Sequence, residues 1–330
     1  MNLPRKSAAD IAKGELPLLI LNESEVQALI DPGALLDALA DGFRDLAHGL
    51  VQSPERPEIT VPGKGFSLAM PAWRDGMPIA VKVVNVFEDN LDLDLPNHLA
   101  TINLFDQNTG APLCVMDGTY ITAIRTAASA VLSVRELARK DAKIVTLIGA
   151  GVQGRQHLSL LPLVRDFAEI RIASLVHADA VSLAKLDPRA VAVADVEQAV
   201  RTSDVVCLAS HSYAPVIAAS WVRPGTHVSS VGYAPPRGEL PVELIDAAIL
   251  FVETKDAFNA PPVGCAELIG RDPASATFLG DALTGKRAGR RSDDEVTLYK
   301  AMGIAMEDLV AADLAFTTAK TRGVGRIVTL

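Results

Sequence analysis

A run of β-branched and apolar residues leads directly into three spaced glycines near the middle of the chain. Residues 144–148 read Ile-Val-Thr-Leu-Ile, and a Gly-x-Gly-x-x-Gly turn and a helix-like segment follow. In such a unit the first glycine permits a tight turn, the second lets the backbone approach a pyrophosphate, and the third lets the helix pack on the strand. Such glycine spacing by itself is weak evidence, because it also arises by chance in glycine-rich loops. The order strand, turn, helix supports a dinucleotide-binding turn here. The turn is therefore predicted to bind a dinucleotide through Gly149, Ala150, Gly151, Val152, Gln153 and Gly154. A purely structural βα turn is the alternative.

The chain that surrounds this turn alternates short apolar segments with helix-like ones. Beyond Lys143, strands are expected at 144–148, 170–173, 190–193, 205–209, 227–231 and 249–252. This is βαβ order, which predicts an α/β fold with a Rossmann-type, doubly wound parallel sheet. Residues 285–294 are polar and basic and are expected to form an exposed loop, and residues 296–320 are expected to form one long final helix.

The first third of the chain has a different pattern. Asp31-Pro32 is a helix-start signal, with Asp as N-cap and Pro in the first turn. Residues 79–86, 100–105 and 111–116 favour strands of a mixed or antiparallel sheet, and residues 122–138 favour a helix. This part predicts a second, α+β domain.

Bulk properties narrow the function classes. The chain has 330 residues, 49% of them hydrophobic, and a net charge of −9 without a basic block, which argues against nucleic-acid binding. No apolar run has the length of a membrane span, and the first 15 residues lack the apolar core of a secretory signal. Three scattered cysteines fit a reducing, cytoplasmic setting, and neither they nor the six histidines have metal-ligand spacing.

Three basic residues stand out by their surroundings. Lys82 lies in an apolar strand, Arg125 lies near the start of a helix of small residues, and Arg56 lies between Pro54 and Pro57. A buried ammonium needs a carboxylate partner or a cavity. The structural alternatives are an internal ion pair for Lys82, a solvated helix face for Arg125 and a surface charge for Arg56. Carboxylates considered as their partners are Glu88, Asp89 and Asp117. Asp308, acidic on an otherwise apolar helix, either faces the active site or pairs with a cation, and the structural role is favoured.

The end of the second parallel strand bears on the type of dinucleotide. An NAD site usually has an acidic residue there for the ribose 2′-hydroxyl, but this chain has Ser174 and then His177, and no carboxylate until Asp179. Ser174 and His177 are predicted to contact the cofactor. The missing acid favours NADPH slightly, with NADH as the alternative.

Taken together, these segments resemble the ornithine cyclodeaminase/μ-crystallin family. The resemblance rests on Lys82-Val83-Val84 with Asn90, Met116-Asp117-Gly118, residues 121–128 (Ile-Thr-Ala-Ile-Arg-Thr-Ala-Ala), the glycine turn with His157-Leu158, and residues 300–308 (Lys-Ala-Met-Gly-Ile-Ala-Met-Glu-Asp). It implies a homodimeric enzyme that handles a small α-amino or α-imino acid with a bound nicotinamide. It also implies a substrate-binding and dimerisation domain built from both chain ends, residues 1–124 and 296–330, around a dinucleotide-binding domain, residues 125–295.

The resemblance also assigns roles. Arg56, Lys82 and Arg125 would hold the substrate carboxylate, which guanidinium groups can bind with two parallel hydrogen bonds. Lys82 is the expected catalytic residue, because it could relay a proton to the substrate nitrogen. Thr126 and Ser210 complete the residues expected at the cofactor.

One position departs from the cyclodeaminases of this family. Their Gly-Asp element aligns with Gly232-Tyr233, and a phenol with an ordinary pKa near ~10 cannot replace a carboxylate base. Tyr233 is instead predicted to contact the substrate and set specificity. The favoured activity is the reduction of a cyclic ketimine, Δ1-pyrroline-2-carboxylate or Δ1-piperideine-2-carboxylate, to L-proline or L-pipecolate. Ornithine cyclodeamination, an open-chain amino-acid dehydrogenase or N-alkyl amino-acid synthase, and a non-catalytic binding module are the alternatives.

Overall fold

The computed structural model describes residues 16–330, which divide into two compact units. The first unit holds the residues up to Arg125 together with Ile304–Leu330, and the second holds Thr126–Gly303. The chain therefore passes from the first unit to the second inside one helix and returns near residue 303. Residues 1–15, which are not expected to form a secretory signal, lie outside the described part.

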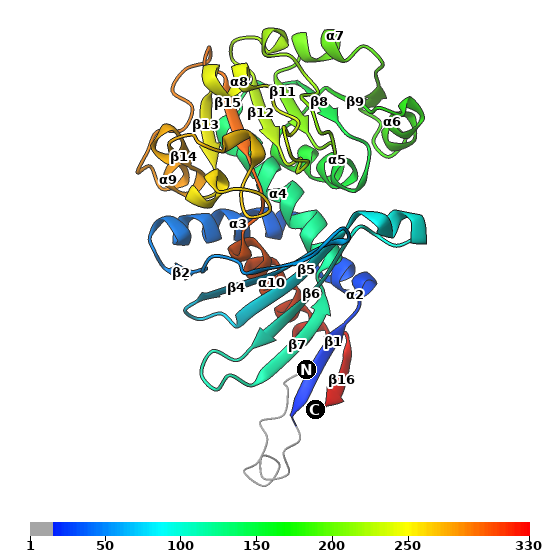
Figure 1. The fold of residues 1–330 in the computed structure, drawn as a ribbon, viewed down its shortest axis with the longest axis vertical. Helices are drawn as coiled ribbons and strands as arrows, with labels where there is room; N and C mark the ends of the chain where they lie inside the picture. The colour runs from blue at the N-terminus through cyan, green and yellow to red at the C-terminus, as the bar shows by residue number, and fades with distance from the viewer. Residues whose placement is uncertain (1–15) are drawn as a thin grey trace. The chain divides into compact units, whose positions relative to one another are not determined.

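The first unit is a mixed sheet with helices (Figure 1). Its strands lie in the order β16-β1-β7-β6-β5-β4-β2, with β3 paired to β4. β1 is parallel to β7 and antiparallel to β16, so the beginning and the end of the described chain share one edge of this sheet. The strands are β1 (Pro17–Leu21), β2 (Val51–Gln52), β3 (Glu58–Val61), β4 (Gly65–Arg74), β5 (Ile79–Phe87), β6 (His98–Phe105), β7 (Pro112–Asp117) and β16 (Arg326–Thr329).

The helices of this unit begin at recognisable caps. Asp31 accepts a hydrogen bond from Ala34 N and precedes Pro32, as the sequence indicated, and Asn22 forms a capping box with Glu25. Such caps satisfy N–H groups that a helix leaves unpaired. The helices are α2 (Glu23–Leu29), α3 (Pro32–Ala47), the first two turns of α4 (Thr119–Leu137), the 3₁₀ helix η1 (Glu88–Leu93) and α10 (Ala305–Arg322).

The second unit contains a single, entirely parallel sheet, which confirms the α/β, Rossmann-type fold class. The strand order is β10-β9-β8-β11-β12-β15-β13-β14. The strands are β8 (Ile144–Ile148), β9 (Glu169–Ala173), β10 (Ala190–Ala192), β11 (Val205–Leu208), β12 (His227–Ser230), β13 (Ile249–Val252), β14 (Thr277–Phe278) and β15 (Thr297–Lys300).

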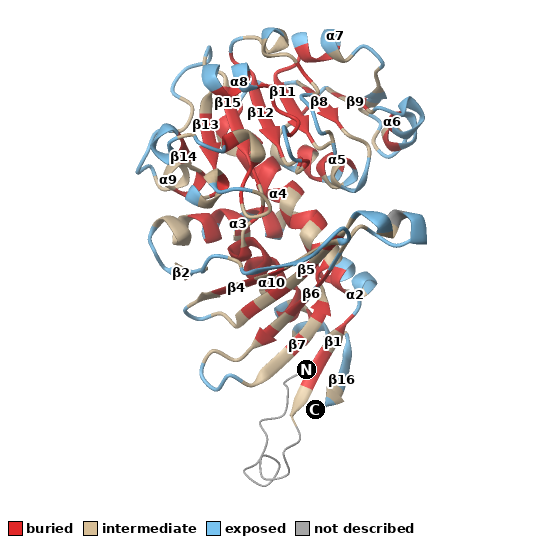
Figure 2. Ribbon diagram, viewed as in Figure 1, coloured by how far each residue is buried: buried red, intermediate tan, exposed pale blue. Residues whose placement is uncertain are grey.

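Helices connect these strands and complete the unit. They are α5 (Val152–Val164), α6 (His177–Ala184), α7 (Val196–Arg201), α8 (Val242–Ala247) and α9 (Leu279–Leu283), with 3₁₀ helices η2 (Ala219–Trp221), η3 (Lys255–Phe258), η4 (Ala266–Leu268) and η5 (Pro273–Ser275). All residues of β11, β12 and β15 are buried (Figure 2), as expected for strands covered on both faces.

The expected final helix over residues 296–320 is wrong in its first part. Residues 297–300 form β15, which pairs with β12 and β13, and α10 begins only at Ala305. Thr-Leu-Tyr-Lys is short and fully buried, and a short apolar run cannot be distinguished from a helix by periodicity alone. Because β15 belongs to the parallel sheet, the return to the first unit lies at 303/304 rather than at the expected 295/296.

Candidate functional site

Lys82 is buried in the first unit, on β5. The strand alternates, with Ala80, Lys82, Val84 and Val86 buried and the residues between them half-buried. The ammonium therefore points to the side on which the sheet packs against α10. Its Nζ lies 2.7 Å from Asp308 Oδ2, and both side chains are at most 1% exposed. The internal ion pair considered from sequence is therefore present.

Arg125 contacts the same carboxylate from another element. It lies in the second turn of α4, which begins three residues before the expected start at Thr122. Its Nε donates to Asp308 Oδ1 at 2.9 Å, and its Nη1 donates to Glu307 Oε2 at 3.1 Å. Arg125 is only 3% exposed, so it is not the solvated helix residue of the structural alternative. Asp308 thus bridges Lys82 and Arg125.

The electrostatics of this cluster follow from burial and proximity. Burial lowers the pKa of Lys82 to about 8; the positive charges of Arg125 and Arg56 act in the same direction, and Asp308 opposes them. For Asp308, burial would raise the pKa, but the nearby Arg125 and Lys82 outweigh it and hold the pKa below its ordinary value. The carboxylate of Asp308 is therefore ionised at neutral pH, and Lys82 titrates near neutral pH.

Arg56 completes the basic group within the first unit. It is half-buried in the segment before β3, and its Nη1 lies 4.0 Å from the sulfur of Met70. Met70 is the cross-strand neighbour of Lys82 on β4, so the side chain of Arg56 reaches the same region. The structure thus gathers the three basic residues singled out from sequence: Arg56, Lys82 and Arg125.

Two of the carboxylates considered from sequence as partners, Asp117 and Asp89, make other contacts. Asp117 caps α4 by accepting from Tyr120 N, and Asp89 lies 3.8 Å from Lys64 on the surface. The partners come instead from α10, where Glu307 and Asp308 are both buried. Two adjacent acids in the first turn of α10 were the available signal. Asp308 was expected to pair with a cation, whereas Glu307 was missed.

In the second unit, the glycine turn lies between β8 and α5. Gly149 has a φ of +119°, and a Cβ there would lie 2.2 Å from Ala209 O. A Cβ on Gly154 would lie 2.1 Å from Gly149 O. Both positions therefore require glycine for the fold itself, as the turn and the close helix packing predicted.

Gly151 differs from its two neighbours in the motif. It has an ordinary φ of −80° as the N-cap of α5, and a Cβ there would meet nothing within 4 Å. The fold therefore does not require glycine at this position. No side chain caps the start of α5, and the positive end of a helix dipole attracts anions. These observations fit a backbone surface kept open for a phosphate group.

The other residues assigned to a cofactor lie around the same sheet. Ser174 follows β9 and is half-buried, His177 begins α6 and is exposed, and Thr126 is half-buried on α4. Ser210 follows β11, and its N–H and hydroxyl both donate to Glu239 Oε2, at 2.9 and 2.6 Å. Ser210 N would also lie 3.2 Å from a Cβ on Gly149, so this segment abuts the glycine turn.

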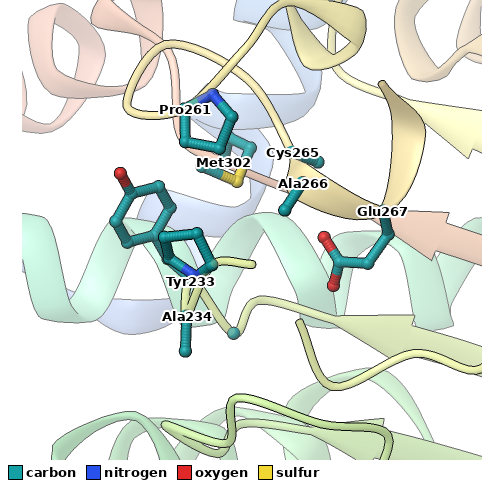
Figure 3. Close-up of a pocket in the computed structure, with 9 residues that line it drawn as sticks. Tyr233, Ala234, Pro261, Cys265, Ala266, Glu267 and Met302 are labelled. Carbon is teal, nitrogen blue, oxygen red and sulfur yellow. The ribbon is translucent and has the colours of Figure 1, made fainter. Parts of the chain in front are cut away.

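Tyr233 lies beyond the end of β12, in a small pocket of the second unit. In Figure 3 the Tyr233 ring and the Glu267 carboxylate lie at opposite sides of this pocket. The lining residues are Gly232, Tyr233, Ala234, Pro235, Pro261, Cys265, Ala266, Glu267 and Met302. Tyr233 therefore belongs to a different unit from the Lys82 cluster.

Other kinds of site find no support between residues 16 and 330. No group of three or more His, Cys, Asp or Glu residues there could hold a metal ion, and no helix in this range is long and apolar enough to cross a membrane. All three cysteines are buried thiols outside any disulfide, which agrees with a packing role.

Comparison with known proteins shows similarity along nearly the whole chain. Residues 18–322 match the ornithine cyclodeaminase/mu-crystallin family model. The structure of Δ1-pyrroline-2-carboxylate reductase from Thermococcus litoralis, in complex with NADH and L-proline, is similar with a TM-score of 0.87 and 34% identity, over 94% of this chain and 100% of that one. A dimeric archaeal alanine dehydrogenase with bound NAD has a TM-score of 0.86 and 29% identity, over 95% and 99%. Mouse ketimine reductase mu-crystallin is 31% identical, over 90% and 96%.

Proposed function

The chain belongs to the ornithine cyclodeaminase/mu-crystallin family, and on that premise we propose that it is an NAD(P)-dependent oxidoreductase that reduces a cyclic α-imino acid. The substrates we propose are Δ1-pyrroline-2-carboxylate and Δ1-piperideine-2-carboxylate, which give L-proline and L-pipecolate. The observation that carries this proposal is the buried cluster of Lys82, Arg125 and Asp308.

The positive charges of this cluster suit a substrate with a carboxylate. Lys82 and Arg125 share the carboxylate of Asp308, and Arg56 adds a third positive charge to their surroundings. These cations would attract a substrate carboxylate. Such pairing is strong where water is excluded, because the effective dielectric constant is low.

The proposed mechanism assigns separate tasks to these residues. Arg56 and Arg125 hold the substrate carboxylate and so fix the orientation of C2, an effect of positioning. A nicotinamide cofactor would supply the hydride that C2 accepts. Lys82 donates a proton to the ring nitrogen and regains it from solvent, which its pKa of about 8 permits near neutral pH. Asp308 keeps Lys82 charged and holds it in place.

For the cofactor, we propose that NADH is used in preference to NADPH. The sequence slightly favoured NADPH because no acid ends β9. In the structure, however, Asp179 lies in the first turn of α6, close after that strand end, and its charge would disfavour a 2′-phosphate. The similar solved proteins contain NADH or NAD, which also supports this choice.

The alternatives make distinct products. Tyr233 occupies the place of the cyclodeaminase aspartate, which argues against ornithine cyclodeamination. The similar alanine dehydrogenase supports reductive amination of pyruvate as the second candidate, because a 2-imino acid formed from pyruvate carries the same carboxylate.

One set of initial rates tests the proposal. The purified protein is assayed for NADH and NADPH oxidation with each cyclic imine and with pyruvate plus ammonia, and for ammonia release from L-ornithine with NAD⁺. We expect the highest kcat/KM with a cyclic imine and NADH. If only pyruvate plus ammonia is turned over, the activity is that of an alanine dehydrogenase and the proposal is replaced. NADH binding without turnover of any substrate would favour a non-catalytic role.

We also propose that a second copy of the chain covers one face of the sheet in the first unit. Val81 and Val83 on β5, and Leu113 and Val115 on β7, alternate with the buried residues and are only half-buried. An apolar sheet face of this kind is typical of an interaction surface. The dimeric state of the similar alanine dehydrogenase supports the same conclusion.

A further inference from the structure

Glu239 is a fully buried acid of the second unit to which neither the motifs nor the proposed mechanism gives a role. Its Oε2 accepts from the N–H and the hydroxyl of Ser210, at 2.9 and 2.6 Å. Its Oε1 accepts from Ser230 Oγ at 2.8 Å and from Gly232 N at 2.7 Å. The carboxylate is thus engaged on both oxygens by protein donors, so it binds protein rather than a ligand.

Lys300 holds the same segment from the other side. Its Nζ donates to Gly232 O at 2.6 Å, to Ser230 Oγ at 3.1 Å and to Glu267 Oε1 at 3.0 Å. Burial alone would lower the pKa of Lys300, but the carboxylates of Glu267 and Glu239 outweigh it and raise the pKa. The backbone of Gly232 is therefore held at its N–H by Glu239 and at its carbonyl by a charged Lys300.

The packing around these bonds leaves little freedom. A Cβ on Gly232 would lie 2.4 Å from the carboxyl carbon of Glu239. The segment of Ser210, which Glu239 also binds, is in turn packed against Gly149 of the glycine turn. The glycine turn, the Ser210 segment and the Gly232–Tyr233 segment thus follow the adjacent parallel strands β8, β11 and β12 in one continuous row.

The strand order indicates which half of a dinucleotide this row faces. Ligands of parallel sheets lie beyond the carboxyl ends of the strands, and the adenosine ribose lies at the strand after the glycine turn. That strand is β9, on one side of β8, whereas β11 and β12 lie on the other side. A dinucleotide that crosses the glycine turn from β9 would extend its nicotinamide half over β11 and β12.

We propose that Glu239 is a positioning residue for the nicotinamide half of the cofactor. By binding Ser210 and Gly232 with one carboxylate, it fixes the spacing between the segments after β11 and β12, including Tyr233. This inference rests on the proposed function only in requiring a nicotinamide dinucleotide, whatever the substrate is.

The carboxylate itself is needed for this role. Two of its four donors are backbone N–H groups, one on each oxygen, and a backbone N–H cannot reverse its direction. In Glu239→Gln the amide NH₂ group must face Ser210 N or Gly232 N, so one of the two segments is released. A hydroxyl can rotate to adapt, and therefore the backbone contacts decide the outcome.

The test compares two ligands that differ only in the nicotinamide ring, which ADP-ribose lacks. NADH and ADP-ribose are titrated into the wild-type chain of residues 1–330, into Glu239→Gln and into the control Glu243→Gln, which replaces an exposed acid of the same unit. We expect Glu239→Gln to raise the Kd for NADH by roughly 10- to 100-fold, the effect of losing a charge-assisted hydrogen bond. The Kd for ADP-ribose should change less than about twofold, and the control should match the wild type for both ligands.

Other results would overturn the inference. An unchanged Kd for NADH, or an equal loss for NADH and ADP-ribose, would mean that Glu239 acts on folding alone. If Glu239→Gln does not fold, Ser230→Ala removes the hydroxyl that joins Glu239 to Lys300, and the same selective loss for NADH is expected, about three- to tenfold. A wild type that binds NADH but reduces no imine would contradict the proposed reaction without affecting this comparison.

Discussion

Asp308 Oδ2 lies 2.7 Å from Lys82 Nζ while its Oδ1 accepts from Arg125 Nε at 2.9 Å. One buried carboxylate on α10 therefore joins a strand and a helix that come much earlier in the chain. Leaving two such cations without their shared anion would be costly, since unpaired buried charges destabilise proteins strongly. In the proposed mechanism, Asp308 is therefore the carboxylate that offsets the charges of both Lys82 and Arg125.

The protonation of Lys82 should be visible in the pH dependence of turnover. Its pKa of about 8 means that the protonated form dominates below pH 8 and is lost above it. We expect kcat/KM for imine reduction to fall about tenfold per pH unit above pH 8, as for a single essential acid. In Asp308→Asn no carboxylate raises the pKa of Lys82, so the decline in kcat/KM should begin at least about one pH unit lower. Asp313→Asn, farther along α10, is the control; a decline at the same pH in all three proteins would contradict the assignment.

Replacement of Lys82 should separate chemistry from cofactor binding. In Lys82→Met, Asp308 keeps its bond to Arg125, so the protein should remain folded. We expect kcat/KM to fall about 10²- to 10⁴-fold, the usual contribution of a positioned proton donor. NADH affinity, measured by fluorescence titration, should stay within about twofold. Residual activity near that of the wild type would show that the proton comes from elsewhere.

The glycines of the turn should divide into two classes. Gly154→Ala places a Cβ 2.1 Å from Gly149 O, so we expect a lower Tm and weaker binding together. Gly151→Ala meets no protein atom within 4 Å, so the Tm of the free protein should be retained while the Kd for NADH rises at least about tenfold. Thermal unfolding with and without NADH measures both effects. A Gly151→Ala variant that binds NADH normally would leave this turn with a structural role only.

Much of the division of the chain into two kinds of fold could be predicted from the sequence. The parallel sheet, the glycine turn and the separate α+β region follow from local periodicity and spacing, which act over a few residues. The partner of Lys82 could not be found in the same way, because Asp308 is brought to it by tertiary packing. Likewise, Thr297–Lys300 is a strand because it fills a place between β12 and β13, and no local preference reveals such a place.

A buried histidine should make the fold sensitive to acid. Burial lowers the pKa of His157 to about 4, against 6.5 for the exposed side chain. Between these values the unfolded chain binds a proton that the folded protein does not, so the free energy of unfolding falls as the pH drops from 6.5 to 4 and is fully retained above 6.5. Between pH 7 and 4.5, the free energy of unfolding should therefore decrease less in His157→Leu than in the wild type, by on the order of 2–3 kcal/mol. Urea unfolding at both pH values measures it, with the exposed His177→Leu as control; equal acid sensitivity in both variants would refute the prediction.

The proposed dimer can be tested on the half-buried sheet face. Val83→Lys introduces a charge on β5 on the side away from α10, where a second copy would have to desolvate it. We expect the variant to run as a monomer in light-scattering measurements while the wild type runs as a dimer. Val181→Lys, on the surface of α6, is the matched control. A monomeric wild type would contradict the proposed dimer, and a dimer that persists in Val83→Lys would place the interface elsewhere.

The position of α10 in the chain has a consequence for synthesis. The strand that bears Lys82 is made early, the whole parallel unit follows, and only then do Glu307 and Asp308 appear. At ordinary translation rates the ammonium therefore waits roughly ten to fifty seconds for its carboxylate. During that interval the nascent sheet also lacks the helix that packs on it, so it is in this period that the growing chain has most need of a chaperone.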